Sequence, residues 1–149
     1  MTRTIAAALA VFGYWMAPAA AADRGQLNRL AGPVPAEVLR VIDGDTLEVR
    51  AHIWLGQQIE TLLRIYGIDA PELKAKCAAE RAAARRARDA LVERIGDQPV
   101  MLRDIRFEKY AGRVMSRVES GGTDVGRALI GDGLVRSYAG KKRERWCET

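Results

Sequence analysis

The sequence predicts a single α+β domain, mainly β, with five strands, a long helix between the third and fourth strands, and a short C-terminal helix. Three observations predict this class. Apolar and polar residues alternate in short runs, as they do in half-buried strands. The stretch 74–95 is rich in Ala, Arg and Glu and lacks Gly and Pro, which is typical of a helix. Turn residues separate these runs, and 149 residues suit one domain with one sizeable core.

The N-terminal residues 1–22 have the pattern of a signal peptide. Arg3 precedes an uncharged apolar run over 5–16, and Ala20-Ala21-Ala22 offers a small-residue cleavage site before Asp23. A membrane-spanning helix is the alternative, but the apolar run is short and has no basic stop-transfer flank. We therefore expect a periplasmic or secreted protein with no stable membrane insertion after processing.

The cysteine count fits export. The chain has two cysteines, Cys77 and Cys147, and outside the cytosol two thiols usually pair. A zinc site is the alternative, but the chain has one histidine and no C-x-x-C spacing. The formal net charge of +5 is compatible with a polyanionic partner such as nucleic acid.

The elements follow in order after the signal peptide. Residues 23–36, which contain Gly32 and two prolines, are expected to form a flexible lead-in, and 37–149 the folded domain. Gly96 ends the long helix, and Thr123 or Asp124 caps the short one. The predicted strands span 37–42, 46–54, 58–67, 100–107 and 112–118, and the predicted helices span 74–95 and 124–130.

Three acids, Asp45, Asp69 and Glu72, lie in turns or at strand ends, and Arg64 lies inside a strand between the first two. Each acid has a plain explanation as a turn former, a helix cap or a first-turn glutamate. Carboxylate oxygens also suit calcium or magnesium, a nearby glutamate can deprotonate water, and a guanidinium matches two phosphoryl oxygens. The set is therefore a candidate site for phosphodiester hydrolysis.

Three strings in the chain carry a more specific indication. D-G-D-T over 43–46 is followed by R-x-x-G-I-D-x-P-E over 64–72 and by K-Y-A-G-R over 109–113. In this order they resemble the staphylococcal nuclease family, and the resemblance covers about 37–138. The R-A-H-I-W-L-G-Q segment and the W-C ending are similar to the exported bacterial branch. The resemblance implies a five-stranded OB-fold barrel, a class that commonly binds oligonucleotides.

The resemblance also implies roles for single residues. It implies a calcium (Ca2+) site at Asp45, Asp69 and the carbonyl of Ala70. It gives Glu72 the role of the acid that activates water, and it gives Arg64 and Arg113 the role of holding the phosphate.

Further residues follow less directly from the resemblance. Lys109 and Tyr110 match positions that contact the terminal phosphate of a bound nucleotide. One residue is inserted there, since Y-G-R has become Y-A-G-R, and this insertion shifts both positions relative to the family. Tyr138 is either a stacking ring or a core tyrosine.

Together with the resemblance, the sequence predicts a monomeric, exported, calcium-dependent nuclease that acts on DNA and RNA. The resemblance alone implies products with 3′-phosphates. The first alternative is a catalytically inactive OB-fold module that binds nucleic acid or protein. Such a module should have lost acids or arginines of the site, and all are present here. A structural domain of an envelope assembly is the second alternative.

Overall fold

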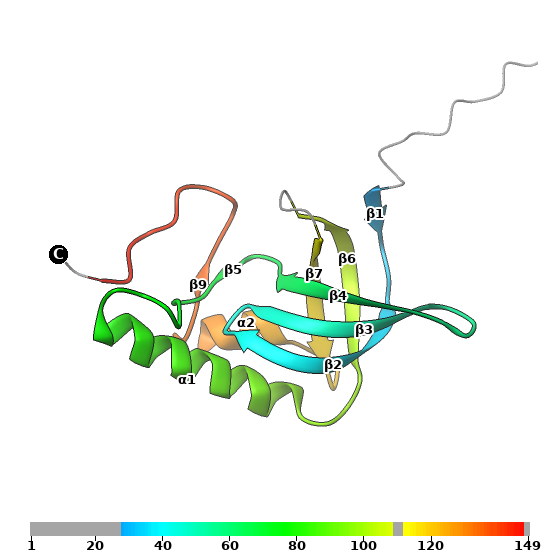
Figure 1. The fold of residues 1–149 in the computed structure, drawn as a ribbon, viewed down its shortest axis with the longest axis horizontal. Coiled ribbons are helices and arrows are strands. Elements are labelled where there is room, and N and C mark those ends of the chain that lie inside the picture. Colours follow the sequence, from blue (N-terminus) through cyan, green and yellow to red (C-terminus); the bar gives the residue numbers. More distant parts are fainter. Residues whose placement is uncertain (1–27, 109–111, 148–149) are drawn as a thin grey trace, which may run out of the picture.

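Five long strands curl into a closed barrel in this computed structural model, which describes residues 28–108 and 112–147. Their order around the barrel is β2, β3, β4, β7 and β6, and β6 pairs again with β2 (Figure 1). The β4–β7 pairing is parallel and the others are antiparallel. This architecture is consistent with the predicted OB-like α+β fold. The barrel strands are β2 (Val34–Asp43), β3 (Thr46–Trp54), β4 (Gln57–Ile65), β6 (Val100–Phe107) and β7 (Arg113–Ser120).

Shorter elements complete the fold. The helices are α1 (Ala78–Ile95) and α2 (Val125–Gly131), and the short strands are β1 (Arg29–Leu30), β5 (Ile68–Asp69), β8 (Thr123–Asp124) and β9 (Arg136–Ser137). The long helix was expected between the third and fourth strands. With the short strands counted, α1 follows β5 and precedes β6, while a tight turn at 55–56 joins β3 to β4.

Helix α1 begins four residues later than the predicted start at residue 74. The Ala75 N–H donates to the Glu72 carbonyl oxygen at 3.1 Å, so a turn occupies this stretch. The Arg81 guanidinium then takes up the carbonyl oxygens of Ala75 and Lys76 at 2.9 and 2.8 Å. Cys77 caps the helix, because its sulfur accepts the Glu80 N–H at 3.4 Å.

Part of the expected lead-in over 23–36 forms regular structure. Strand β1 pairs with β6, and β2 already begins at Val34, which is buried and lies opposite Leu102. Gly32 allows this close approach, since a Cβ there would lie 2.3 Å from the Leu102 carbonyl oxygen. The predicted signal peptide lies outside the described residues. Within 28–108 and 112–147, no helix is long and apolar enough to cross a membrane.

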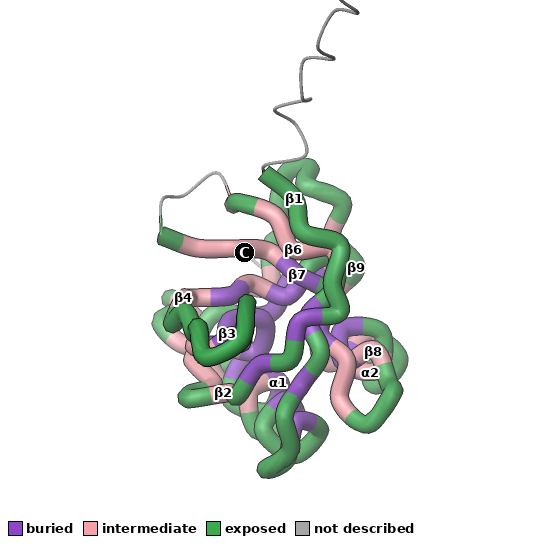
Figure 2. The backbone as a smooth tube through the Cα atoms, turned by 90° about the vertical axis from the view of Figure 1, so that its right-hand side faces the viewer, coloured by how far each residue is buried: buried purple, intermediate pink, exposed green. Residues whose placement is uncertain are grey.

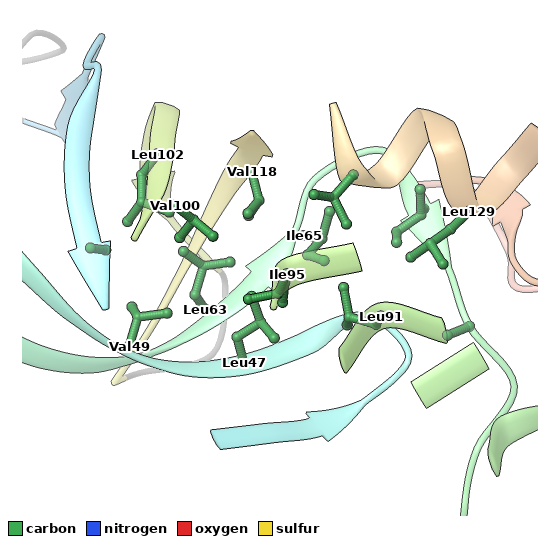
Figure 3. Packing of buried hydrophobic residues seen from close by; sticks show 14 of the residues in the cluster. Leu47, Val49, Leu63, Ile65, Leu91, Ile95, Val100, Leu102, Val118 and Leu129 are labelled. Carbon is green, nitrogen blue, oxygen red and sulfur yellow. The ribbon is translucent and has the colours of Figure 1, made fainter. Parts of the chain in front are cut away.

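The core fills the barrel and the space between the barrel and the helices. Alternate residues of the strands point inward, and the buried positions gather at the centre of the molecule (Figure 2). Leu91 and Ile95 of α1 and Leu129 of α2 pack against this strand cluster (Figure 3). Each fully buried Leu, Ile or Val contributes about 1.5–3 kcal/mol through burial. The strand residues of this cluster that Figure 3 labels are Leu47, Val49, Leu63, Ile65, Val100, Leu102 and Val118.

The predicted pairing of Cys77 with Cys147 is confirmed. A disulfide joins the two residues, whose Cα atoms are 6.1 Å apart across a sequence separation of 70. Because the sulfur atoms are bonded to each other, they provide no thiolates for zinc. The bond attaches the C-terminal segment to the start of α1, and Figure 1 shows that segment passing close to this end of the helix.

Candidate active site

Asp45 is a buried carboxylate in the turn between β2 and β3, where only 5% of the residue is exposed. Its Oδ1 accepts the Thr46 hydroxyl at 2.9 Å, and its Oδ2 accepts the Ala70 N–H at 3.2 Å. Gly44 makes this approach possible, because a Cβ there would lie 2.8 Å from the Ala87 Cβ and 3.0 Å from the Ala70 Cβ. The D-G-D-T string therefore does more than turn the chain: it packs a carboxylate against the end of β5.

Arg64 joins the two buried aspartates. The β3–β4 register places it opposite Thr46, so its side chain reaches the same end of the barrel. Its Nη2 lies 3.0 Å from Asp45 Oδ2 and 3.7 Å from Asp69 Oδ1. Asp69, the last residue of β5, is only 4% exposed. The structure thus brings together three residues that were predicted as a site.

A cavity of about 390 Å³ lies beside this group. Its lining includes Arg64, Asp69, Arg113 and Tyr138. Because β4 and β7 pair in parallel, with Leu62 opposite Arg113, the two predicted phosphate-binding arginines come from neighbouring strands. With Arg143 and Glu108, which also line it, the cavity is bordered by three arginines and two acidic residues.

Arg113 and Tyr138 have defined partners at the cavity. Arg113 forms an ion pair with Glu108, with 2.8 Å between Nε and Oε2. Tyr138 is half-buried, and its hydroxyl donates to the Lys141 carbonyl oxygen at 2.7 Å. Tyr138 is not part of the buried core cluster, and it lines the cavity. Lys109 and Tyr110, the other predicted nucleotide contacts, lie outside the described residues.

The cavity also contains an aromatic residue that sequence reasoning missed. Tyr66 lies two residues after Arg64 and lines the same cavity. The Arg106 guanidinium lies over its ring at 4.2 Å from the centroid, a cation–π contact. Tyr66 lies in the turn directly after β4, so the alternation of the strand does not indicate where its side chain lies.

Glu72 lies at the exposed edge of the site, in the turn before α1. Its backbone N–H donates to Glu80 Oε1 at 3.2 Å, which fixes the turn. Its carboxylate accepts Nη1 of Arg143 at 2.6 Å. Glu72 is therefore adjacent to Asp69 and Ala70, but more open to solvent than the buried aspartates.

Arg143 and Trp146 are further residues of this site that the sequence did not reveal. Arg143 Nε lies 3.0 Å from Asp69 Oδ1, and its Nη2 donates to the Ala70 carbonyl oxygen at 2.5 Å. Trp146 Nε1 donates to Asp69 Oδ2 at 3.1 Å. No local pattern could indicate contacts with residues that lie more than seventy positions earlier. Only the W-C ending and the cysteine pairing gave a hint that this segment is fixed.

Burial and neighbouring charges shift the pKa values of three groups at the site. Burial raises the pKa of Asp45, and the nearby Glu72 adds to this rise, while Arg64, the Thr46 hydroxyl and the Ala70 N–H act against it. Burial also raises the pKa of Asp43, with further increases from Glu72 and Asp45. Asp43 therefore belongs to the acidic group, although the sequence analysis treated it only as part of a turn.

The acids beside Arg143 favour the charged form of its side chain. Burial alone lowers the pKa of its guanidinium, but the hydrogen bond to Glu72 and the charge of Asp69 outweigh this, so its pKa is raised. Two positive side chains, Arg64 and Arg143, thus balance the acids.

The oxygen donors at this site are of the type that hard divalent cations prefer. The carboxylates of Asp69 and Glu72 and the carbonyl oxygen of Ala70 all contact one guanidinium, so these oxygens face a common positive group. Asp45 adds a second buried carboxylate through the shared contact with Arg64. Oxygen donors without thiolate or imidazole suit calcium or magnesium better than zinc.

Comparison with known proteins adds no family assignment. No family model matches this chain, and no curated protein matches it significantly.

Proposed function

We propose that this protein is an exported, monomeric, calcium-dependent nuclease that hydrolyses phosphodiester bonds of DNA and RNA on an OB-fold barrel. One observation carries the proposal: Arg64 bridges Asp45 and Asp69 at a cavity that Arg113 also lines. Phosphodiester hydrolysis needs oxygen ligands for a cation and fixed positive charge for the phosphate, and this grouping supplies both kinds of group.

Each residue then has a defined task. Asp45, Asp69 and the Ala70 carbonyl would hold calcium, which acts as a Lewis acid toward a phosphoryl oxygen when bound. Arg64 and Arg113 orient the phosphate from two neighbouring strands and balance its charge.

Glu72 receives the proton of the attacking water. Its exposed position suits this task, because water reaches it without entering the core. The oxygen on the 5′ side leaves, so the products carry 3′-phosphates, as the resemblance to the staphylococcal nuclease family implies. Tyr138 offers a ring for a base next to the phosphate.

The direct test is an assay of the purified chain on DNA and on RNA, first with calcium and then with excess chelator. We expect cleavage that calcium supports and that the chelator abolishes. Glu60→Gln serves as a matched control, because it neutralises an exposed carboxylate on the β3–β4 hairpin and should leave the rate unchanged. No cleavage of either substrate with calcium would refute the proposal.

Two variants separate the role of metal ligand from the role of base. Asp45→Ala removes an oxygen ligand, so calcium affinity should fall and added calcium should partly restore the rate. Glu72→Gln keeps the size of the side chain but loses the proton acceptor, so calcium should still bind while hydrolysis slows. A calcium titration of the rate compares the two. Equal shifts in calcium affinity would make Glu72 a ligand instead of a base.

A non-catalytic module that binds nucleic acid or protein is the second candidate. The contacts of Arg143 with Asp69 and Glu72 favour it, because this guanidinium neutralises the acids that catalysis needs. Binding of an oligonucleotide at low salt without cleavage at any calcium concentration would decide for this candidate.

A further inference from the structure

The C-terminal strap, defined as residues 139–147, crosses the acidic side of the site. Its Arg143 uses all three guanidinium nitrogens there. Nε lies 3.0 Å from Asp69 Oδ1, Nη1 lies 2.6 Å from Glu72 Oε1, and Nη2 lies 2.5 Å from the Ala70 carbonyl oxygen. This one side chain therefore contacts two acids and a main-chain oxygen.

The strap is held by several contacts on the C-terminal side of Arg143. Cys147 is bonded to Cys77 at the start of α1, and Trp146 donates to Asp69. The Arg136 guanidinium lies 3.9 Å from the Trp146 ring centroid and donates to the Arg145 carbonyl oxygen at 3.0 Å. The position of Arg143 therefore results from a disulfide, an aromatic contact and hydrogen bonds, and not from Arg143 alone.

Two of the three groups that Arg143 engages, Asp69 and the Ala70 carbonyl, are also proposed to hold the divalent cation. A guanidinium and a divalent cation repel each other, and both need the same lone pairs of Asp69 and the Ala70 carbonyl. The two positive groups therefore exclude each other at this position.

We propose that Arg143 is an internal competitor for the divalent cation, so that the cation binds only when the strap withdraws this guanidinium from Asp69, Ala70 and Glu72. This inference rests on the proposed cation site and adds a mode of regulation to it. The strap is a latch on the acidic side of the site, and the disulfide limits how far the latch can open.

The exposed fractions of Arg143 and Asp69 are those expected of a latch. The side chain of Arg143 is 37% exposed, whereas that of Asp69 is 6% exposed, so the guanidinium can move into solvent while the carboxylate stays in place. The tether keeps Arg143 at a high effective concentration beside the acids. The apparent affinity for the cation is then reduced in proportion to the fraction of molecules in which the latch is open.

The test measures binding of calcium chloride by isothermal titration calorimetry to the full purified chain and to two variants. Arg143→Ala removes the competitor, and we expect calcium affinity to rise by about tenfold or more. Lys142→Ala is the matched control, since it removes the same charge from an exposed neighbour in the strap and should leave the affinity within about twofold. Circular dichroism confirms that both variants are folded.

A third variant tests the tether. Cys77→Ser combined with Cys147→Ser frees the strap while keeping Arg143, so calcium affinity should rise by less than in Arg143→Ala. An equal change in Arg143→Ala and Lys142→Ala would overturn the proposal, because net charge would then explain it. Unchanged or lower affinity in Arg143→Ala would also overturn it, as would the absence of calcium binding in every variant.

These outcomes are separate from the fate of the proposed function. The chain could cleave neither DNA nor RNA while Arg143→Ala gains calcium affinity and Lys142→Ala does not. That result would support the latch and refute the nuclease. Cleavage with calcium but no gain in calcium affinity in Arg143→Ala would support the nuclease and refute the latch.

Discussion

Arg64 and Arg143 both place a guanidinium against Asp69, yet different parts of the molecule hold them. Arg64 belongs to a barrel strand, is paired on both sides within the sheet, and has a side chain that is 21% exposed. Arg143 belongs to a strap without regular structure, and its side chain is 37% exposed. Sheet pairing therefore fixes the first guanidinium, whereas a disulfide and a few polar contacts fix the second. The difference indicates that the barrel holds Arg64 in a fixed position, whereas Arg143 in the strap can change its position.

Removal of the disulfide should have the largest effect on stability. Cys77→Ser with Cys147→Ser opens a loop of 70 residues, which costs roughly 4 kcal/mol in the chain-entropy model. Urea unfolding followed by circular dichroism measures the loss, and the strand signal should persist in the absence of urea. Reductant should destabilise the natural chain and leave the double variant unchanged. An unchanged midpoint would mean that the strap adds nothing to the stability of the fold.

Arg64→Lys should reduce the rate of hydrolysis by about 100- to 1000-fold, because a point charge cannot replace a bidentate fork. Circular dichroism should show an intact fold, since the lysine stem still covers the barrel wall. Arg50→Lys is the control, because Arg50 pairs with Glu37 and Glu60 on the exposed hairpin, and its rate should not change. A near-normal rate of hydrolysis in Arg64→Lys would show that the guanidinium of Arg64 is not needed for the reaction.

Gly44→Ala tests how tightly the barrel side is packed. The added methyl group would meet Ala87 and Ala70 at 2.8 and 3.0 Å, so we expect a loss of about 1–3 kcal/mol in the free energy of unfolding. Gly131→Ala is the control, because nothing lies within 4 Å of its added methyl group, and it should not destabilise the protein. Equal stability of the two variants would show that the turn and α1 can separate without cost.

Much of the fold follows from local patterns. The strands over 46–54 and 100–107 have the predicted bounds, because alternation is strong where one face is buried. The start of α1 was predicted too early, since propensity does not register the turn and the Cys77 cap that precede the helix. The pairing of β1 with β6 was missed because two residues carry no periodicity.

Some residues of the site could also be predicted from local patterns, and others could not. Asp45, Arg64 and Asp69 could be identified because each lies in a recognisable string near a strand end. Arg143 could not be identified, because it is one of several basic residues in a tail whose path depends on a distant disulfide. A residue that is held in place by regular structure can be predicted from the local sequence. A residue that is held in place by tertiary contacts cannot.

The parallel pairing of β4 with β7 has a kinetic consequence. These strands lie far apart in the chain, with α1 and β6 between them, so Arg64 and Arg113 meet only after this non-local contact has formed. Barrels dominated by such contacts fold in roughly milliseconds to seconds, slower than helical bundles. During refolding, recovery of phosphate binding should therefore lag behind the formation of helical signal and coincide with closure of the barrel.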